Sequence, residues 1–300
     1  MVSRGAKVLL IGLLGMFCQG TQLPPPKPND SADGVHVSPK VRLRDGRYLA
    51  YREKGVPKDQ AKHIIIIVHG FGSSKDMNFL APQELIDELG IYILQYDRAG
   101  YGESDPNPKR SLKSEALDIE ELADQLQIGS KFYVIGVSMG LAGVAMIAPV
   151  INYQWPSFPE SLIKKDYKRK LIKCAVLLAK YFPRLLLWWE KLREQVVFDT
   201  LRDDWLVAFG EWEFDPLKLS NPFPHNTSSA HIWQGYEDKV VPSQIQRFVT
   251  EKLPWIQYHE VPDGGHLIVH YSGVCEAILK ALLLGEQNLL YRPRSGVSVS

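Results

Sequence analysis

The sequence has few cysteines and almost no net charge. Its three cysteines, Cys18, Cys174 and Cys275, are far apart and odd in number. They therefore give no disulfide framework and no zinc-ligand spacing. The formal net charge is +1, so overall electrostatics provide no reason to expect nucleic acid as a partner. We expect neither a bound metal nor a nucleic-acid partner.

A hydrophobic run long enough to cross a bilayer is lacking at the N-terminus. The apolar stretch VLLIGLLGMF would form a helix about 15 Å long, against a bilayer core of about 30 Å. Arg4 and Lys7 precede it, and small residues at Cys18 and Gly20 follow it, which is typical of a secretory signal peptide. A membrane anchor and an apolar tail without targeting meaning are the alternatives. A signal peptide or a membrane anchor predicts a location in the secretory pathway or endomembranes, with possible membrane attachment.

The rest of the chain has the composition and patterning of an α/β protein. Of its 300 residues, 45% are hydrophobic and 23% charged, which suits one sizeable core. An Asp45-Gly46 pair between alternating runs predicts a β-hairpin over 41–55. Apolar, largely β-branched runs predict strands covered on both faces. Predicted strands are 63–70, 91–97, 131–137, 229–238 and 255–263, with helices at 82–90 and 117–129. This alternation predicts a mostly parallel sheet with helices on both faces.

The pentapeptide GVSMG at 136–140 follows a predicted buried strand. It fits G-x-S-x-G, in which a serine occupies a sharp turn after a strand, and the flanking Gly136 and Gly140 leave room for that turn. A serine hydroxyl needs a base, and the base needs an acid that orients it. His266 and Asp238 each follow a later predicted strand, so Ser138, Asp238 and His266 are the candidate catalytic residues. Asp215 is the rival acid.

Two loops are expected to complete the site. HGFG at 69–72 follows the first long strand, and its Phe71 amide, with that of Met139, is the candidate oxyanion hole. DRAGYGESD at 97–105 follows the next strand and should form a tight loop. The residues expected to support these loops are His69, Gly70, Asp97, Gly100, Gly102, Gly136 and Gly140. For His69 we expect a bracing role, without chemistry.

These motifs give the chain a clear resemblance to the α/β-hydrolase fold family, from about Val35 to Leu284. HGFGSS, DRAGYGESD, GVSMG, GYEDKVVP and GGHLI occur in the family's order. The chain is similar to plant esterase-like members with an N-terminal apolar segment. Composition and the resemblance together divide the chain into six segments: a signal peptide or anchor (1–20), a Pro-rich linker (21–34), the first core part (35–150), a shortened helical cap (151–228), the second core part (229–285) and a tail (286–300).

The resemblance implies hydrolysis but does not name the substrate. Our hypothesis is a serine hydrolase that cleaves a carboxylic ester without a cofactor, and the aromatic-rich stretch at 153–215, a cap in that family, implies an apolar acyl or alcohol part. The partner would be a small-molecule ester. A serine at the nucleophile position argues against the epoxide hydrolase and dehalogenase branches. The alternative is a catalytically impaired isoform or a non-catalytic binding protein on the same fold. Its motive is two apparent internal losses, after GVSMG and near 188–190, which suggest skipped exons or a gene-model variant.

The run AGVAMIAPV at 142–150 poses a topological problem. The family places a helix between GxSxG and the next parallel strand, and here that helix is missing. If this run were the next parallel strand, the three residues between Ser138 and Ala142 would have to carry the chain back along the sheet. They span at most about 11 Å, which is less than the length of a six-residue strand, about 20 Å. An antiparallel turn, one continuous strand and a helix are the alternatives, and we favour a helix over 141–148. The sheet would then lack one strand, and we expect parallel pairing between 133–135 and 231–233.

Overall fold

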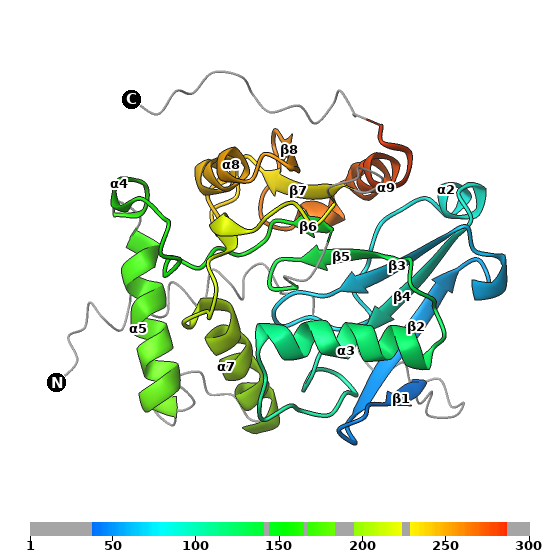
Figure 1. The fold of residues 1–300 in the computed structure, drawn as a ribbon, viewed down its shortest axis with the longest axis horizontal. Coiled ribbons are helices and arrows are strands. Elements are labelled where there is room, and N and C mark those ends of the chain that lie inside the picture. The colour runs from blue at the N-terminus through cyan, green and yellow to red at the C-terminus, as the bar shows by residue number, and fades with distance from the viewer. Residues whose placement is uncertain (1–37, 141–143, 165–166, 184–194, 224–228, 287–300) are drawn as a thin grey trace.

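The computed structural model describes residues 38–140, 144–164, 167–183, 195–223 and 229–286. Its centre is an eight-stranded sheet in the order β1-β2-β4-β3-β5-β6-β7-β8 (Figure 1). The strands are β1 (Lys40–Arg42), β2 (Tyr48–Gly55), β3 (His63–Val68), β4 (Ile91–Tyr96), β5 (Tyr133–Val137), β6 (Ala145–Ile147), β7 (Ala230–Gly235) and β8 (Ile256–Val261). Only β2 pairs antiparallel, with β1 and β4, so the predicted mostly parallel sheet is confirmed.

Several predictions concern residues outside these ranges. The predicted signal peptide or anchor at 1–20, the linker at 21–34 and residues 287–300 of the predicted tail lie outside the described residues. So do parts of the predicted cap, at 165–166, 184–194 and 224–228. Within the ranges that are described, no helix is both long and apolar enough to span a membrane.

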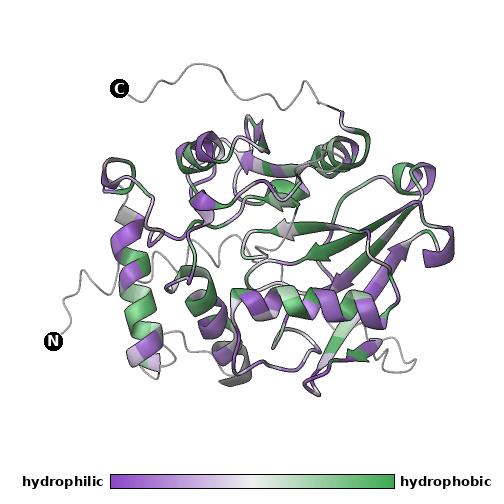
Figure 2. Ribbon diagram, viewed as in Figure 1, coloured by the Kyte–Doolittle hydropathy of each residue, from purple (hydrophilic) through white to green (hydrophobic). Residues whose placement is uncertain are grey.

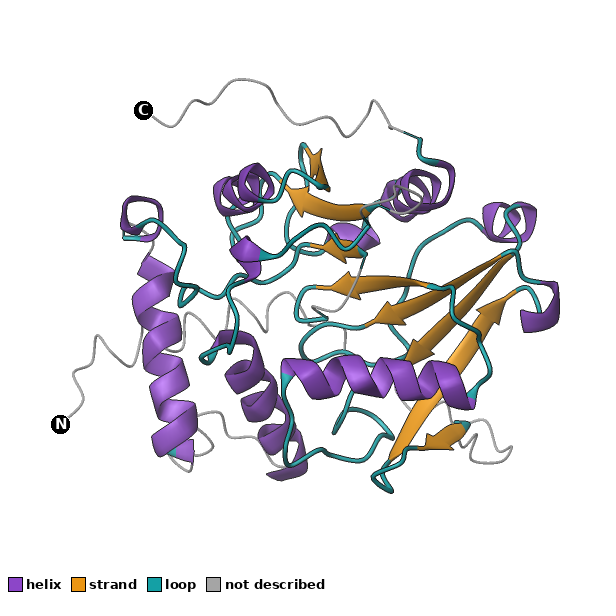
Figure 3. Ribbon diagram, viewed as in Figure 1, coloured by secondary structure: helices purple, strands orange, loops and turns teal. Residues whose placement is uncertain are grey.

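Helices cover both faces of the sheet, and further helices lie beyond the carboxyl ends of its strands (Figure 3). They are α2 (Gln83–Glu88), α3 (Leu112–Gln125), α4 (Glu160–Ile163), α5 (Tyr167–Tyr181), α7 (Gln195–Phe209), α8 (Ser243–Lys252) and α9 (Val274–Leu284), with short 3-10 turns η1 (Lys58–Gln60), η2 (Pro216–Lys218) and η3 (Ile268–His270). Helix α3 begins at Leu112 rather than near residue 117. Ser111 caps it in a reciprocal pair with Ser114, and this polar first turn lies outside the apolar periodicity.

The continuous apolar strands are buried on both faces, as β3 illustrates. Ile65 and Ile67 pack with α2 and α9 in one core cluster. Ile66 and Val68, the alternate residues, pack with α3 in another. Successive side chains of a strand point to opposite faces, so a strand between two helical layers must be apolar at every position. Figure 2 shows the strands in the centre of the sheet as largely hydrophobic.

Helices α5 and α7 lie side by side, beyond the carboxyl ends of β5 and β7 (Figure 1). Aromatic residues from this region, among them Trp155, Trp205 and Phe209, pack in one cluster with Ile232 of β7. These aromatic residues therefore contribute to a core that they share with the sheet.

The helix expected over 141–148 is wrong: residues 145–147 form β6, and the sheet does not lack this strand. Strand β6 pairs in parallel with β5 through Ile135↔Ala145 and with β7 through Ala145↔His231. The expected direct pairing of 133–135 with 231–233 is therefore also wrong. The backbone groups that would otherwise face a gap are bonded, as in His231 N–H to Val144 O at 2.7 Å and Ala148 N–H to Trp233 O at 2.7 Å.

The topological argument failed because it assumed a strand of about six residues. Strand β6 has three residues, so the chain returns by only about 7 Å along the sheet at about 3.3 Å per residue. Seven residues, 138–144, connect Val137 to Ala145, and they reach well beyond that distance even when they are not fully extended. A short parallel strand thus needs no crossover helix.

Candidate active site

Ser138 occupies a strained turn directly after β5. Its φ is +52°, a region that side-chain-bearing residues rarely adopt and that is associated with functional sites. A Cβ on Gly140 would lie 2.5 Å from the Val68 carbonyl oxygen, and a Cβ on Gly70 would lie 3.2 Å from the Ser138 Cβ. A side chain at position 140 would thus clash with the backbone, and one at position 70 would crowd the Ser138 turn. The third glycine, Gly136, lies within β5 opposite Val68.

The three candidate catalytic side chains form a continuous hydrogen-bonded series. The Oγ of Ser138 lies 2.9 Å from Nε2 of His266. The Nδ1 of the same ring lies 2.8 Å from Oδ2 of Asp238. With the proton on Nδ1, the ring donates to the carboxylate and accepts the serine hydroxyl proton. The series comes from the ends of three strands, since Asp238 follows β7 and His266 follows β8.

The Asp238 carboxylate is held in its charged form. Its Oδ1 accepts hydrogen bonds from the amides of Val240 at 2.7 Å and Val241 at 2.9 Å, and Gln234 donates to Oδ2 at 2.8 Å. Burial alone would raise the pKa of Asp238, but the bonds from His266, Val241 and Gln234 outweigh burial and lower it. The buried carboxylate is thus an acceptor only, as the orienting acid of such a series must be.

The rival acid Asp215 and the other histidines in or after β7 and β8, namely His231, His259 and His270, lie in other interactions or elements. Asp215 caps η2 by accepting from the Leu217 amide at 3.1 Å, and it also accepts the Ser157 hydroxyl. His231 and His259 are bonded to each other, with 2.9 Å between Nδ1 and Nε2. His270 lies in η3. The structure therefore brings together Ser138, Asp238 and His266, and not these alternatives.

The HGFG loop contacts the Ser138 turn through Gly70. Phe71 follows Gly70, and its ring packs edge-on against Trp205 of α7, with 6.4 Å between ring centroids. Met139 follows Ser138, and its side chain is buried in the cluster that also contains Trp205. The two residues expected to supply the oxyanion amides thus belong to two segments that meet at Ser138.

His69 bridges two backbone segments. Its Nε2 accepts from the Arg98 amide at 3.0 Å, and its Nδ1 lies 2.8 Å from the Gly70 carbonyl oxygen. Complete burial, followed by the nearby positive charge of Arg98, lowers the pKa of His69 to about 3. The ring is therefore neutral, with its proton on Nδ1. Both ring nitrogens are occupied, which leaves neither for proton transfer.

The DRAGYGESD loop is closed around Asp97. Its Oδ2 accepts from Nζ of Lys75 and from the Glu103 amide, each at 3.0 Å. A Cβ on Gly102 would lie 2.2 Å from that oxygen. Gly100 has φ +80°, and a Cβ there would lie 2.6 Å from Oγ1 of Thr200 in α7. These two glycines thus permit the tight loop, and Gly100 also permits close contact with α7.

A buried ion cluster links this loop to α7, and sequence reasoning missed it. Arg98 forms a two-pronged pair with Asp204, at 2.8 and 2.5 Å, and Tyr101 donates to the same carboxylate at 2.7 Å. Arg110 adds ion pairs to Asp204 at 3.0 Å and to Glu115 at 2.5 Å. Burial would raise the pKa of Asp204, but the charges of Arg98 and Arg110 lower it. Arg98 and Asp204 are 106 positions apart in the chain, so no local sequence pattern indicates that they pair.

Comparisons with known proteins agree with this architecture. The alpha/beta hydrolase family matches residues 65–277. An esterase from Exiguobacterium antarcticum shares the fold with a TM-score of 0.52 at 19% identity, covering 78% of this chain and 94% of the esterase. A hydrolase from Pseudomonas aeruginosa gives 0.53 at 17%, covering 83% and 98%. Mouse alpha/beta hydrolase domain-containing protein 10 gives 0.51 at 17%, covering 81% and 96%. The curated proteins contain no match.

Proposed function

Because this chain belongs to the alpha/beta hydrolase family, we propose that it is a serine hydrolase that cleaves carboxylic esters through Ser138, His266 and Asp238. The observation that carries the proposal is the hydrogen-bonded series from the Ser138 hydroxyl through the His266 ring to the buried Asp238 carboxylate. Nucleophile, base and orienting acid at these separations are what acyl transfer by a serine requires.

The reaction would proceed in two halves. As Ser138 Oγ attacks the ester carbonyl carbon, its proton moves to Nε2 of His266, and Asp238 stabilises the resulting imidazolium. The carbonyl oxygen becomes negative and accepts hydrogen bonds from the amides of Phe71 and Met139. The tetrahedral intermediate collapses, and the alcohol leaves with the proton from His266. Water, deprotonated by the same ring, then attacks the acyl-enzyme and releases the acid and Ser138.

The chemistry of the surrounding residues supports an ester with an apolar part. The Phe71 ring, next to one proposed oxyanion amide, contacts Trp205 of α7. Met139, which carries the other amide, belongs to the same apolar cluster. Apolar substituents on the acyl or alcohol side would be favoured beside such walls. Similarity to plant esterase-like members is a finer proposal, and it rests on the motifs and the N-terminal apolar segment alone.

A catalytically impaired protein is the second candidate. Its motive is the connection after Ser138, where β6 follows within seven residues and the described residues contain no helix behind the nucleophile. A separation beyond roughly 6 Å between the serine oxygen and the histidine ring, far outside hydrogen-bond reach, would favour it. The distance of 2.9 Å between Ser138 Oγ and His266 Nε2 favours the active enzyme.

The proposal is tested by reacting the purified protein with a fluorophosphonate probe and locating the adduct by peptide mass spectrometry. We expect labelling at Ser138, together with hydrolysis of p-nitrophenyl butyrate. Ser138→Ala should abolish both while keeping the circular dichroism spectrum. Failure of the folded wild-type protein to label and to hydrolyse short and medium p-nitrophenyl esters would favour the impaired alternative.

A further inference from the structure

One face of the sheet is covered by two helices with a space between them. Helix α3 packs on β3 and β4 through Ile119 and Leu122. Helix α8 packs on β7 through Ile245 and Val249. Strands β5 and β6 lie between β3 and β7 in the sheet, and within the described part of the chain no helix packs on this face between α3 and α8. The short connection after Ser138 is the reason, because it leaves no residues for such a helix.

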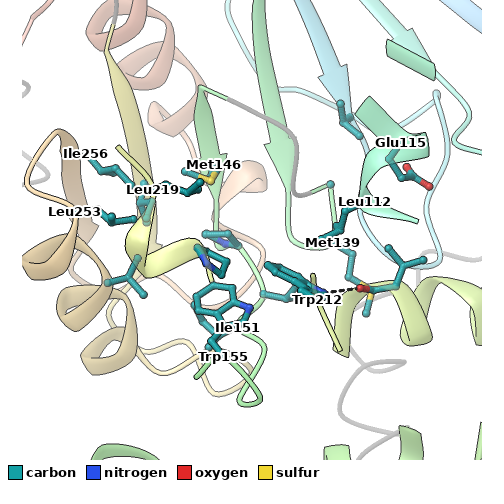
Figure 4. A pocket seen from close by; sticks show the side chains of 18 of the residues that line it. Leu112, Glu115, Met139, Met146, Ile151, Trp155, Trp212, Leu219, Leu253 and Ile256 are labelled. Atoms are coloured by element: carbon teal, nitrogen blue, oxygen red, sulfur yellow. Dashed lines mark hydrogen bonds between the residues drawn. The ribbon is translucent and has the colours of Figure 1, made fainter. Parts of the chain in front are cut away.

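A cavity of about 310 Å³ occupies this space. It crosses the sheet face from Tyr96 of β4 to Ile256 of β8 and passes Met146 of β6. Figure 4 shows Leu112 and Met139 on one side, Leu253 and Ile256 on the other, and Trp155 and Trp212 across from Met146. The wall is therefore almost wholly aliphatic and aromatic. Pockets that bind small molecules have volumes of about 300–1,000 Å³ and walls of this kind.

The few charges in the wall are already neutralised. Arg98 is paired with Asp204, and Glu115 is paired with Arg110. A charged ligand would lose its hydration without gaining a free counter-charge, which is costly in an apolar site. A neutral ligand avoids this cost.

The wall residues do have unused hydrogen-bonding capacity. Four buried polar atoms of these residues have no hydrogen-bond partner within the described chain: Tyr96 Oη, Arg98 Nε, Trp155 Nε1 and Gln246 Oε1. Unsatisfied buried groups of this kind are destabilising. A hydroxyl or carbonyl oxygen on the ligand could satisfy one of them after a small side-chain movement.

The cavity is separate from the reacting groups. Its wall includes Met139 and Gly140, the two residues after Ser138, but none of Ser138, Asp238 and His266. The Ser138 hydroxyl engages His266. A molecule in the cavity would therefore lie behind the nucleophile turn, in contact with its backbone support.

We propose that this cavity is a second binding site, which takes a neutral, mainly hydrocarbon molecule with one hydroxyl or carbonyl group. A medium-chain alcohol has the required chemistry, since its chain would contact Met139 and Met146 and its oxygen would meet an unpartnered polar atom of the wall. Binding here would fill the space between α3 and α8 and stabilise the Ser138 turn from behind.

The test uses Ser138→Ala protein labelled with ¹³C at the methionine methyl groups and titrated with 1-decanol. Met139 and Met146 lie in the cavity wall, whereas Met77 packs on the opposite face of the sheet and is an internal control. We expect saturable shifts at Met139 and Met146, no shift at Met77, and at least tenfold weaker binding of decanoate at pH 7.5. No shift up to the solubility limit, equal shifts at all three, or tighter decanoate binding would overturn the proposal.

A variant provides a second, independent measurement. Met146→Trp adds bulk inside the cavity, and Leu117→Trp adds the same bulk at an exposed position of α3. We expect the first to abolish the decanol-induced shift of Met139 and the second to preserve it. If Met146→Trp does not fold, the three methionine signals of the Ser138→Ala protein decide alone. Because that protein has no nucleophile, the outcome does not depend on whether the wild-type protein labels with fluorophosphonate.

Discussion

The Oγ of Ser138 lies 2.9 Å from Nε2 of His266, although 128 positions separate the two residues in the chain. The serine is fixed at the end of β5 and the histidine beyond the end of β8, with β6 and β7 between those strands. Parallel strands bring their carboxyl ends to one edge of the sheet, where such folds build their sites. The contact therefore depends on the order of the strands as much as on the two side chains.

The role of the acid can be tested with Asp238→Asn. An amide would donate to Nδ1 of His266 and favour the tautomer in which Nε2 carries the proton, so the ring could no longer accept one from Ser138. We expect kcat for p-nitrophenyl butyrate to fall by about three to four orders of magnitude with little change in KM. The matched control is Asp215→Asn, which alters the cap of η2 and should leave kcat within about twofold. Equal losses in both variants would contradict the assignment.

The buried ion cluster predicts a large stability effect at Asp204. Asp204→Ala would leave Arg98 and Arg110 charged and buried without their main partner, which costs about 3–5 kcal/mol. Urea denaturation followed by fluorescence measures the loss. The control is Asp199→Ala, whose partly exposed pair with Arg202 on the same helix is worth less than about 1 kcal/mol. A loss at Asp204 no greater than at Asp199 would show that the cluster does not hold α7.

Close packing of the DRAGYGESD loop against α7 can be separated from backbone strain. Gly100→Ala imposes a side chain at φ +80° and places its Cβ 2.6 Å from Thr200 Oγ1. Gly129→Ala imposes one at φ +87° with nothing within 4 Å. Backbone strain alone costs about 1 kcal/mol. We therefore expect Gly129→Ala to lower the free energy of unfolding by about that much and Gly100→Ala to lower it clearly more. Similar melting temperatures would contradict the tight contact.

Stability should fall on mild acidification because three buried histidines are neutral in the folded state. Burial lowers the pKa of His69 to about 3, of His231 to about 4 and of His259 to about 3. An unfolded histidine binds a proton near pH 6.5. The contribution of each neutral histidine to the free energy of unfolding is therefore complete above pH 6.5. It is lost as the pH falls from 6.5 toward 4, by up to about 1.4 kcal/mol per pH unit for each histidine.

This pH dependence is measured by urea unfolding between pH 7.5 and pH 4.5. His69→Gln replaces one of the three groups with a side chain that does not titrate, and should reduce the slope of unfolding free energy against pH. Asp238 acts in a lower range, because its pKa lies below the usual value of 3.8, so its contribution is lost only below about pH 4. A flat profile down to pH 4.5 would mean that the histidines become protonated without unfolding.

The sequence predicted most of the elements because burial on both faces imposes a simple rule. The buried positions of a strand such as β3 must be apolar on both faces, and the run IIIIV at 64–68 shows this pattern directly. The motif order likewise predicted which residues follow which strands. Strand β6 was not predicted, because AMI within an alanine-rich run has no local preference that decides between helix and strand. What decides is the backbone of β5 on one side and β7 on the other, and no short window of sequence contains both.

The ion pairs of Arg98 and Arg110 with Asp204 were not predicted for a related reason. Arg98 lies within a recognisable loop motif, but its partner Asp204 is one of two adjacent aspartates on α7. Only the way α7 lies against the loop distinguishes Asp204, which is 1% exposed, from its neighbour Asp203. The orientation of a helix about its own axis depends on tertiary packing, which the charges themselves do not encode.

Strand β6 has a mechanical consequence for the proposed enzyme. The nucleophile belongs to the N-terminal half of the sheet, and the acid and base belong to the C-terminal half. The two halves are joined through the backbone of three residues. Without β6, a gap of one strand spacing, about 4.8 Å, would separate β5 from β7. Movement of β7 to close that gap would displace Asp238 and His266 by more than the hydrogen bond between Ser138 and His266 allows. The separation of nucleophile and base is therefore a property of main-chain geometry, set by the extended backbone of β6 between β5 and β7.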